Sequence, residues 1–426
     1  MRRIILILTL FMAVVSNAQQ LSLENIWNSR EFSPKFTPGF NTLSDGKTFC
    51  RLDMNEDKSR SCNRYDIRTG NKIGQVFSTD KMLVDSQPIQ IESYAFSQDE
   101  KKVLITNGFE SVYRHSGMSN VYVFDLRTNK LSRVSNRKIM YPQFSPDGNK
   151  VAYVIENNLY YFDLVKNKEV KITSDGMKNS IINGAVDWVY EEEFSMSQGY
   201  EWSPDGQYLA YYKFNEEKVP FFSMDIFGSL YPKKEIWKYP KAGEANSKVD
   251  VYIHKLGKKK DVLCMTGSEN DQYLPRIKWI STNYLSIQRL NRLQNKLEVL
   301  KFSYYFNQPE IIYTEENARY IDIEDWTFFG GKDSNGVYAM FTSEKSGYKH
   351  LYKLDGKYNV SQVTQGNWEL DVFLGESNGI AYFTSGKDNP SERQLYSVEI
   401  KTGKMKQLTN EPGWHSISFT STFDYF

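Results

Sequence analysis

Three consecutive glutamates occur in a segment that is otherwise rich in aromatic residues. The segment reads Asp187-Trp188-Val189-Tyr190-Glu191-Glu192-Glu193-Phe194. Two carboxylates a few ångströms from one ammonium group would each contribute about 4 kcal/mol of attraction at an effective dielectric constant of 20. Carboxylates placed this close together repel each other unless a cation lies between them. The pattern therefore has two interpretations, a cation-binding site or the solvated end of a loop or helix.

The acidic segment and several shorter motifs resemble the propeller region of the dipeptidyl peptidase IV family, within the prolyl oligopeptidase-like serine peptidases. As in that family, the acidic motif is followed by Trp-Ser-Pro-Asp-Gly at 202–206. The other matching motifs are Tyr113-Arg114-His115-Ser116, Lys213-Phe214-Asn215-Glu216 with Val219-Pro220, Lys238-Tyr239-Pro240-Lys241-Ala242-Gly243, Asn291-Arg292-Leu293-Gln294-Asn295 and Gly366-Asn367-Trp368-Glu369. The resemblance covers essentially the whole chain after residue 18.

The resemblance implies a role for each residue that matches a family motif. Glu192 and Glu193 would hold the free α-ammonium of a substrate peptide, which fixes the distance to the scissile bond so that two residues are released. Arg114 would hydrogen-bond a substrate carbonyl and orient the two glutamates. An arginine beside two carboxylates also keeps both ionised. Glu191 is expected to be structural.

The family's nucleophile lies on a Gly-x-Ser-x-Gly elbow in an α/β-hydrolase domain that follows the propeller. We expect this elbow and its domain to be absent from the chain, so we assign no catalytic residue and expect no hydrolysis of Xaa-Pro substrates by the chain alone. The four histidines are expected to be structural: His115, His254, His350 and His415. The sequence contains no His-Glu-x-x-His, Cys-x-x-Cys or Walker motif, so no metal or nucleotide cofactor is expected.

A repeat of about 50 residues organises the rest of the chain. The segment 144–148 (Phe-Ser-Pro-Asp-Gly) recurs at 202–206, with weaker copies at 96–100 and 43–46. Proline presets the first turn position, aspartate caps its own backbone, and glycine takes the position that needs a positive φ. Short apolar strands follow each turn. The pattern predicts an all-β propeller of about eight blades with four antiparallel strands each, the last blade opening near Ser416 and incomplete.

The ends of the chain and its composition limit the remaining possibilities. Residues 1–18 have the pattern of a signal peptide, with Arg2 and Arg3 before a mostly apolar run of twelve residues. Residues 19–426 are then the propeller, with an inserted arm at about 213–248, in an exported protein that is periplasmic, secreted or at the outer surface. The 53 basic and 52 acidic residues argue against nucleic-acid binding. In an oxidising compartment Cys50 and Cys62 could form a disulfide or remain free thiols.

The resemblance thus implies a substrate-gating and N-terminus-clamping propeller of a peptidase that releases Xaa-Pro or Xaa-Ala dipeptides. Its expected partners are a peptide with a free N-terminus and proline or alanine in second position, the hydrolase domain that follows in the family, and a second copy in a homodimer. Two alternatives stay open. The chain could be a non-catalytic binding or scaffold propeller, or the propeller of a prolyl tripeptidyl peptidase.

Overall fold

The computed structural model describes residues 21–29, 31–33, 39–56, 59–267, 271–329 and 336–426. The chain divides into two compact units, Met1–Asn41 and Thr42–Phe426. In the smaller unit, the helix α2 (Leu23–Trp27) begins after Ser22, whose hydroxyl accepts a hydrogen bond from the Asn25 amide. The predicted signal peptide, residues 1–18, lies outside the described residues.

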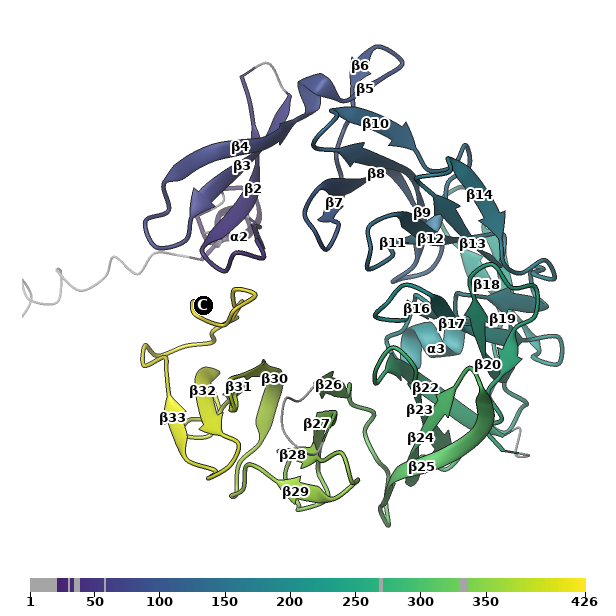
Figure 1. Cartoon of the computed structure of the whole chain (residues 1–426), viewed down its shortest axis with the longest axis vertical. Helices are drawn as coiled ribbons and strands as arrows, with labels where there is room; N and C mark the ends of the chain where they lie inside the picture. The colour runs from purple at the N-terminus through teal and green to yellow at the C-terminus, as the bar shows by residue number, and fades with distance from the viewer. Residues whose placement is uncertain (1–20, 30, 34–38, 57–58, 268–270, 330–335) are drawn as a thin grey trace, which may run out of the picture. The chain divides into compact units, whose positions relative to one another are not determined.

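Seven antiparallel sheets form the blades of a β-propeller in the larger unit (Figure 1). Blade 1 contains β1 (Asn41–Thr42), β2 (Thr48–Met54), β3 (Arg60–Asp66) and β4 (Lys72–Ser78). Blade 2 contains β7 (Ser93–Phe96), β8 (Lys102–Ser111), β9 (Gly117–Asp125) and β10 (Lys130–Arg133). Blade 3 contains β11 (Met140–Phe144), β12 (Lys150–Ile155), β13 (Asn158–Asp163) and β14 (Lys168–Lys171). Blade 4 contains β15 (Ile181–Asn183), β16 (Tyr200–Trp202), β17 (Tyr208–Asn215), β20 (Lys248–Lys255) and β21 (Val262–Leu263).

The last three blades each have four strands. Blade 5 contains β22 (Gln272–Trp279), β23 (Leu285–Asn291), β24 (Lys296–Ser303) and β25 (Phe306–Glu316). Blade 6 contains β26 (Thr327–Phe329), β27 (Tyr338–Ser343), β28 (His350–Leu354) and β29 (Val360–Gln362). Blade 7 contains β30 (Leu370–Ser377), β31 (Ile380–Ser385), β32 (Gln394–Glu399) and β33 (Met405–Gln407). Between blades 1 and 2 lie the 3-10 turn η1 (Thr79–Lys81) and the short pair β5 (Leu83–Val84) and β6 (Gln87–Pro88).

The prediction of about eight blades is wrong, because the described residues form seven. No strand forms in the segment from Ser416 onward, where the eighth blade was expected. A strand needs a hydrogen-bonded neighbour, and this segment instead packs its aromatic rings on blade 7 and on one another. The Phe423 ring lies 5.5 Å from that of Tyr382 in β31. At the same time Ser421 Oγ donates to the Leu43 carbonyl in blade 1 at 3.2 Å.

The Ser-Pro-Asp-Gly turns have the predicted conformation. In the first of them, Ser145 Oγ accepts from the Lys150 amide at 2.9 Å, and Gly148 has a φ of +63°. The turns of neighbouring blades also contact each other. A Cβ placed on Gly148 would lie 3.2 Å from the Ser97 Cβ of blade 2, and one on Gly206 would lie 3.5 Å from the Pro146 Cδ of blade 3. The repeated turns therefore set the spacing between blades as well as ending the strands.

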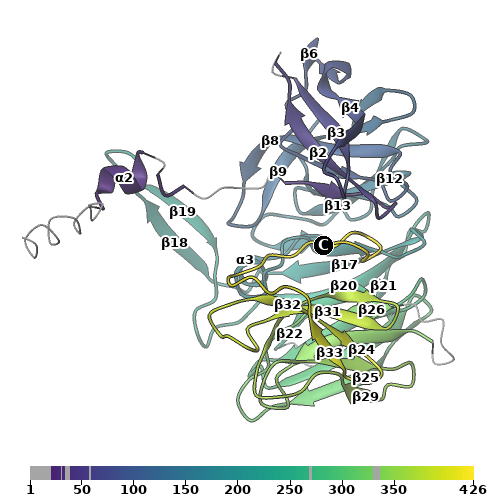
Figure 2. The ribbon, with the colours of Figure 1, turned by 90° about the vertical axis from the view of Figure 1, so that its left-hand side faces the viewer.

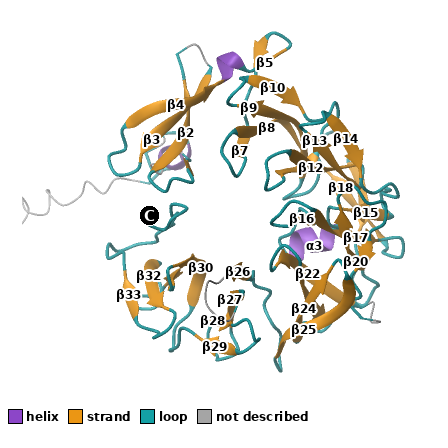
Figure 3. Cartoon of the chain, in the orientation of Figure 1, coloured by secondary structure: helices purple, strands orange, loops and turns teal. Residues whose placement is uncertain are grey.

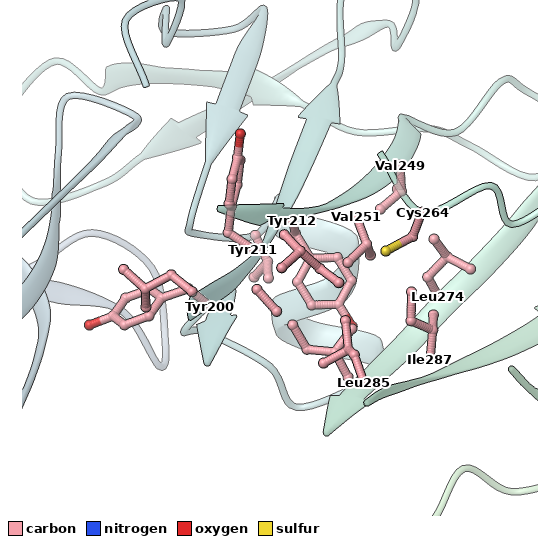
Figure 4. Close-up of a cluster of buried hydrophobic side chains, with 14 of the residues drawn as sticks. Tyr200, Tyr211, Tyr212, Val249, Val251, Cys264, Leu274, Leu285 and Ile287 are labelled. Atoms are coloured by element: carbon pink, nitrogen blue, oxygen red, sulfur yellow. The ribbon is translucent and has the colours of Figure 1, made fainter. Parts of the chain in front are cut away.

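The largest buried cluster lies around the middle strands of blades 4 and 5. Figure 4 shows Tyr212 and Val251 of blade 4 facing Leu274 and Ile287 of blade 5, and all four side chains are fully buried. The middle strands are apolar on both sides because each blade is covered by a neighbour on each face. Such packing makes the ends of the strands a firm support for the loops that they carry.

A hairpin of β18 (Phe221–Ile226) and β19 (Lys233–Lys238) occupies the middle of the segment predicted as an arm, residues 213–248. Figure 2 shows this hairpin extending away from the sheets of the larger unit. Its tip carries large apolar side chains that are almost wholly exposed, at 81% for Phe227, 91% for Leu230 and 80% for Tyr231. Exposed apolar side chains in such a group are typical of a surface that binds a protein.

The cysteines are buried free thiols. Cys50 pairs with Arg64, and Cys62 pairs with Leu52, so the two cysteines are diagonal neighbours on β2 and β3. Diagonal neighbours in an antiparallel pair have Cα atoms about 7–8 Å apart, beyond the usual range for a disulfide. The backbone of this hairpin therefore favours two thiols over a bridge.

Replacing Gly148 by alanine should destabilise the propeller by about 1–2 kcal/mol, because a side chain at positive φ is strained and the new Cβ would press on Ser97. Urea unfolding followed by tryptophan fluorescence measures the change. Gly74→Ala is the control, because nothing lies within 4 Å of its Cβ position and its φ is not positive. Equal stability of the two variants would contradict the account of the turns.

Candidate functional site

The acidic segment forms a short helix, α3 (Trp188–Glu193), between β15 and β16, and it is the α-helix of the larger unit in Figure 3. The helix begins at Asp187, whose carboxylate accepts from the Tyr190 amide at 3.0 Å. The same carboxylate accepts from Ser247 Oγ at 2.6 Å. The buried hydroxyl of Tyr190 accepts from the Leu274 amide at 2.8 Å. A six-residue helix is not stable alone, so these contacts with blades 4 and 5 hold it in place.

The three consecutive glutamates point in different directions, because successive residues of a helix are turned by about 100°. Glu191 points inward, with an exposed fraction of 1%. Its carboxylate accepts from the His115 amide at 2.7 Å. The side chain of Glu192 is 15% exposed, and that of Glu193 is exposed. The structural role expected for Glu191 agrees with its burial and its backbone partner.

Arg114 lies in the connection between β8 and β9 and reaches α3 from blade 2. Its Nε lies 3.5 Å from Glu192 Oε1, while 72% of the arginine side chain stays exposed. Among the described residues no hydrogen bond or ion pair engages the Glu193 carboxylate, which is exposed. Of the predicted site residues, the structure thus brings Arg114 and Glu192 together and leaves Glu193 beside them on the same helix. Donors of the arginine and oxygens of both carboxylates remain available to a ligand.

A buried polar cluster beneath α3 was not assigned any role from the sequence. Burial raises the pKa of Asp187. Burial, reinforced by the charge of Asp187, raises the pKa of Glu216 to about 7. Lys238 is also buried and donates to the Val219 carbonyl at 2.7 Å. Burial, together with the charges of Glu216, Glu191 and Asp187, raises the pKa of Tyr113 to about 12.

Two of these residues belong to motifs that were quoted above for the family resemblance. Glu216 ends the Lys-Phe-Asn-Glu motif and Lys238 begins the Lys-Tyr-Pro-Lys-Ala-Gly motif. The two motifs flank the β18–β19 hairpin, and the ring of Tyr239 lies 4.8 Å from that of Trp188 in α3. These two motifs were therefore the signal in the sequence that the base of the hairpin supports the helix.

The expectation that the chain lacks a Gly-x-Ser-x-Gly pattern needs correction. The string occurs once, as Gly375-Glu376-Ser377-Asn378-Gly379. It lies at the end of β30 and in the turn to β31, where Ser377 pairs with Ile380. Asn378 and Gly379 have φ values of +54° and +80°, as in a two-residue hairpin turn. A nucleophile elbow joins a strand to a helix, so this serine is part of a β-hairpin.

Three of the four histidines have side-chain hydrogen-bond partners within the described residues. His254 Nδ1 lies 2.7 Å from Asp261 Oδ1, His350 bonds to Thr364 Oγ1 and the Gly366 carbonyl, and His415 bonds to the Glu411 carbonyl. In the described part of the chain, no group of three or more His, Cys, Asp or Glu side chains is arranged to hold a metal ion. No helix among these residues has the length and apolar character needed to cross a membrane.

Comparison with protein families gives one match that covers most of the chain. Residues 97–426 match the family described as "Dipeptidyl peptidase IV (DPP IV) N-terminal region". The chain is 30% identical over 374 residues to dipeptidyl peptidase 4 of Trichophyton rubrum, which covers 82% of this chain and 48% of that protein. It is 29% identical over 334 residues to prolyl endopeptidase FAP of Mus musculus, covering 73% and 44%. The chain spans about half the length of these curated relatives.

The solved structures that are similar to the chain include two bacterial proteins. The dipeptidyl peptidase 4 of Porphyromonas gingivalis superimposes with a TM-score of 0.85 at 30% identity, covering 95% of this chain and 57% of that one. A putative dipeptidyl aminopeptidase IV from Bacteroides ovatus gives a TM-score of 0.67 at 20% identity, covering 87% and 53%. The second likeness is one of fold.

Replacing Glu216 by glutamine should remove a pH-dependent destabilisation. The folded carboxyl keeps its proton up to about pH 7, whereas the unfolded one releases it near 4.5, so stability falls as the pH rises between these values. The shift corresponds to about 3 kcal/mol. Urea unfolding at pH 5 and pH 8 should therefore show a stabilisation by Glu216→Gln that is larger at pH 8. The control is Glu217→Gln, at the exposed residue next in the chain. The same pH trend in this control variant would contradict the assignment of the effect to Glu216.

Proposed function

The chain belongs to the dipeptidyl peptidase IV N-terminal-region family, and we propose that it is the substrate-gating and N-terminus-clamping propeller of a serine peptidase that releases Xaa-Pro or Xaa-Ala dipeptides. Glu192 and Glu193 receive the free α-ammonium of the peptide, and Arg114 donates to a peptide carbonyl. The groups that break the bond belong to the hydrolase domain that follows in the family. The leader predicted at residues 1–18 makes this an exported, periplasmic, secreted or outer-surface activity.

The observation that carries the proposal is the position of Arg114 beside Glu192, with Glu193 as the next residue of α3. Glu192 is mostly shielded from solvent and pairs with the arginine at 3.5 Å, while Glu193 is open to solvent. An ammonium group has three donors and no acceptor, so two carboxylates and a free face suit it. Holding the peptide by its end converts binding energy into orientation of the scissile bond.

A cavity of about 410 Å³ supports the gating part of the proposal. Its wall includes Phe96 of β7, Phe144 of β11, Trp202 of β16 and Lys278 of β22, from blades 2 to 5. In Figure 1 these four strands lie on the inner side of their blades. The wall combines apolar rings with polar side chains such as Gln143 and Glu201. Such a mixed surface suits an extended peptide, which is what a route to the clamp would have to admit.

Binding of a short peptide with proline in second position tests the clamp. The chain should bind the peptide with a free N-terminus about tenfold or more tightly than the N-acetylated peptide, because hydrogen bonds to charged groups contribute about 1.5–3 kcal/mol. Glu192→Gln and Glu193→Gln should each remove most of this difference. Isothermal titration calorimetry or fluorescence anisotropy measures it.

The control variant is Glu217→Gln, an exposed glutamate at the base of the hairpin. Equal affinity for the free and acetylated peptides, unchanged in the two clamp variants, would favour a scaffold propeller. The length of the product released by the protein joined to its hydrolase domain separates dipeptidyl from tripeptidyl activity, because a tripeptidyl enzyme holds the ammonium one residue farther from the scissile bond.

The same proposal includes a homodimer that forms through the β18–β19 hairpin. Because the apolar tip is exposed, burying it against a second copy would be favourable. Leu230→Ser with Phe227→Ser should shift sedimentation velocity from dimer to monomer, whereas Val165→Ser, at an exposed turn of blade 3, should leave it unchanged. A wild-type chain that sediments as a monomer at all concentrations would contradict the dimer.

A further inference from the structure

The connection between β8 and β9 is joined to α3 by a buried contact as well as by the exposed ion pair. Glu191, with an exposed fraction of 1%, accepts from the His115 amide at 2.7 Å. The amide belongs to blade 2 and the helix to blade 4, so the contact passes over blade 3. A buried backbone amide left without an acceptor is costly, so an acceptor that reaches the His115 amide ties the turn to the helix.

Blade 3 contributes Tyr141 to the same junction. This tyrosine has a φ of +55° within β11, where the register shifts between Met140 and Gln143. Its carbonyl accepts a hydrogen bond from the Tyr200 hydroxyl. Burial and the charge of Glu191 raise the pKa of its phenol, and a hydrogen bond with Ser116 acts in the opposite direction. A non-glycine residue in the left-handed region is strained, and strain of this kind gathers at functional sites.

Arg114 cannot fix its own position. Its side chain is 72% exposed, and its ion pair with Glu192 is 3.5 Å long, which is the kind of surface pair that contributes little. The turn that carries it is closed by Val112 N to Ser116 O at 2.9 Å and Tyr113 N to Ser116 Oγ at 3.1 Å. Neither bond ties the turn to α3. In the described part of the chain, the hydrogen bond from the His115 amide to Glu191 is the one that joins this turn to α3.

We propose that Glu191 is a positioning residue that holds the turn of residues 112–116 against α3 and so places Arg114 beside Glu192. The consequence for substrate rests on the proposed clamp function. The attachment of the turn to α3 is independent of that function. Glu191 touches no ligand in this scheme and acts through Arg114.

Two substitutions at Glu191 separate the effect of its charge from the effect of its side-chain length. Glu191→Asp keeps the charge but is one methylene too short for the His115 amide, and Glu191→Gln keeps the reach and an accepting oxygen. Hydrogen exchange of the segment 112–118, followed by mass spectrometry, should be about tenfold or more faster in Glu191→Asp and within a few-fold of wild type in Glu191→Gln. A purely electrostatic role would give the opposite order and would overturn the proposal, as would unchanged exchange in both variants.

The matched control is another buried glutamate that accepts side-chain hydrogen bonds. Glu315 is 9% exposed and accepts from Tyr313 and Ser343. Glu315→Asp should leave the exchange of the segment 112–118 unchanged. If it accelerates exchange there as much as Glu191→Asp does, the effect is a general loss of stability and the proposal fails.

The affinity for the peptide with a free N-terminus tests the link to the clamp. Arg114→Ala and Glu191→Asp should each weaken binding several-fold, and the double variant should be no weaker than Arg114→Ala, because both changes remove one interaction. Additive losses would overturn the positioning role. If exchange responds as expected but no variant alters peptide binding, the turn is still held by Glu191 and the proposed clamp is what fails.

Discussion

The capping of α3 by the buried Asp187 carboxylate is the constraint on which the acidic site depends. A buried carboxylate is costly unless hydrogen bonds replace its water, and here Ser247 Oγ and the Tyr190 amide do so. The helix is too short to select its own position. Its start is therefore fixed by Asp187, and its middle is fixed by the bond from the Leu274 amide to the Tyr190 hydroxyl. These two contacts decide where the next three side chains point.

Helical geometry separates three identical residues into three environments. Glu191 turns into the protein and binds a backbone amide, Glu192 lies at the boundary beside Arg114, and Glu193 faces solvent. A strand would have placed Glu191 and Glu193 on one face, and a flexible loop would not hold the two outer carboxylates together against their repulsion. The short, capped helix thus provides a pair of carboxylates while using the third as an anchor.

The sequence predicted those parts of the molecule that are determined locally. The turn at Ser145–Gly148 was predicted with its mechanism, because a proline and a glycine restrict their own φ angles and need no distant partner. The number of blades was predicted wrongly, since the aromatic residues near Phe419 read as a strand but pack on Tyr382. Whether such a segment forms a strand depends on a hydrogen-bonding neighbour, and a linear pattern does not contain that information.

The positions of the candidate site residues could be predicted to a similar extent. The neighbouring carboxylates and Arg114 came from motifs, and the structure places Arg114 beside Glu192. The cluster of Asp187, Glu216 and Lys238 was not recognised, because its members come from three segments that meet only after folding. The Gly-x-Ser-x-Gly pattern around Ser377 is the opposite case. The sequence matches a nucleophile elbow, but these residues form a β-hairpin, which cannot present the serine as an elbow does.

The spacing between blades 2, 3 and 4 relates the repeated turns at one end of their strands to Arg114 and α3 at the other end. Ser97 contacts the Gly148 turn, and Pro146 contacts the Gly206 turn, so blades 2, 3 and 4 are locked together at one end of their strands. The turn that carries Arg114 lies at the opposite end of β8, and α3 precedes β16 of blade 4. Closely packed sheets transmit displacements with little compression. The repeated turns, which have no chemical role of their own, therefore help to set the separation between an arginine of blade 2 and a glutamate of blade 4.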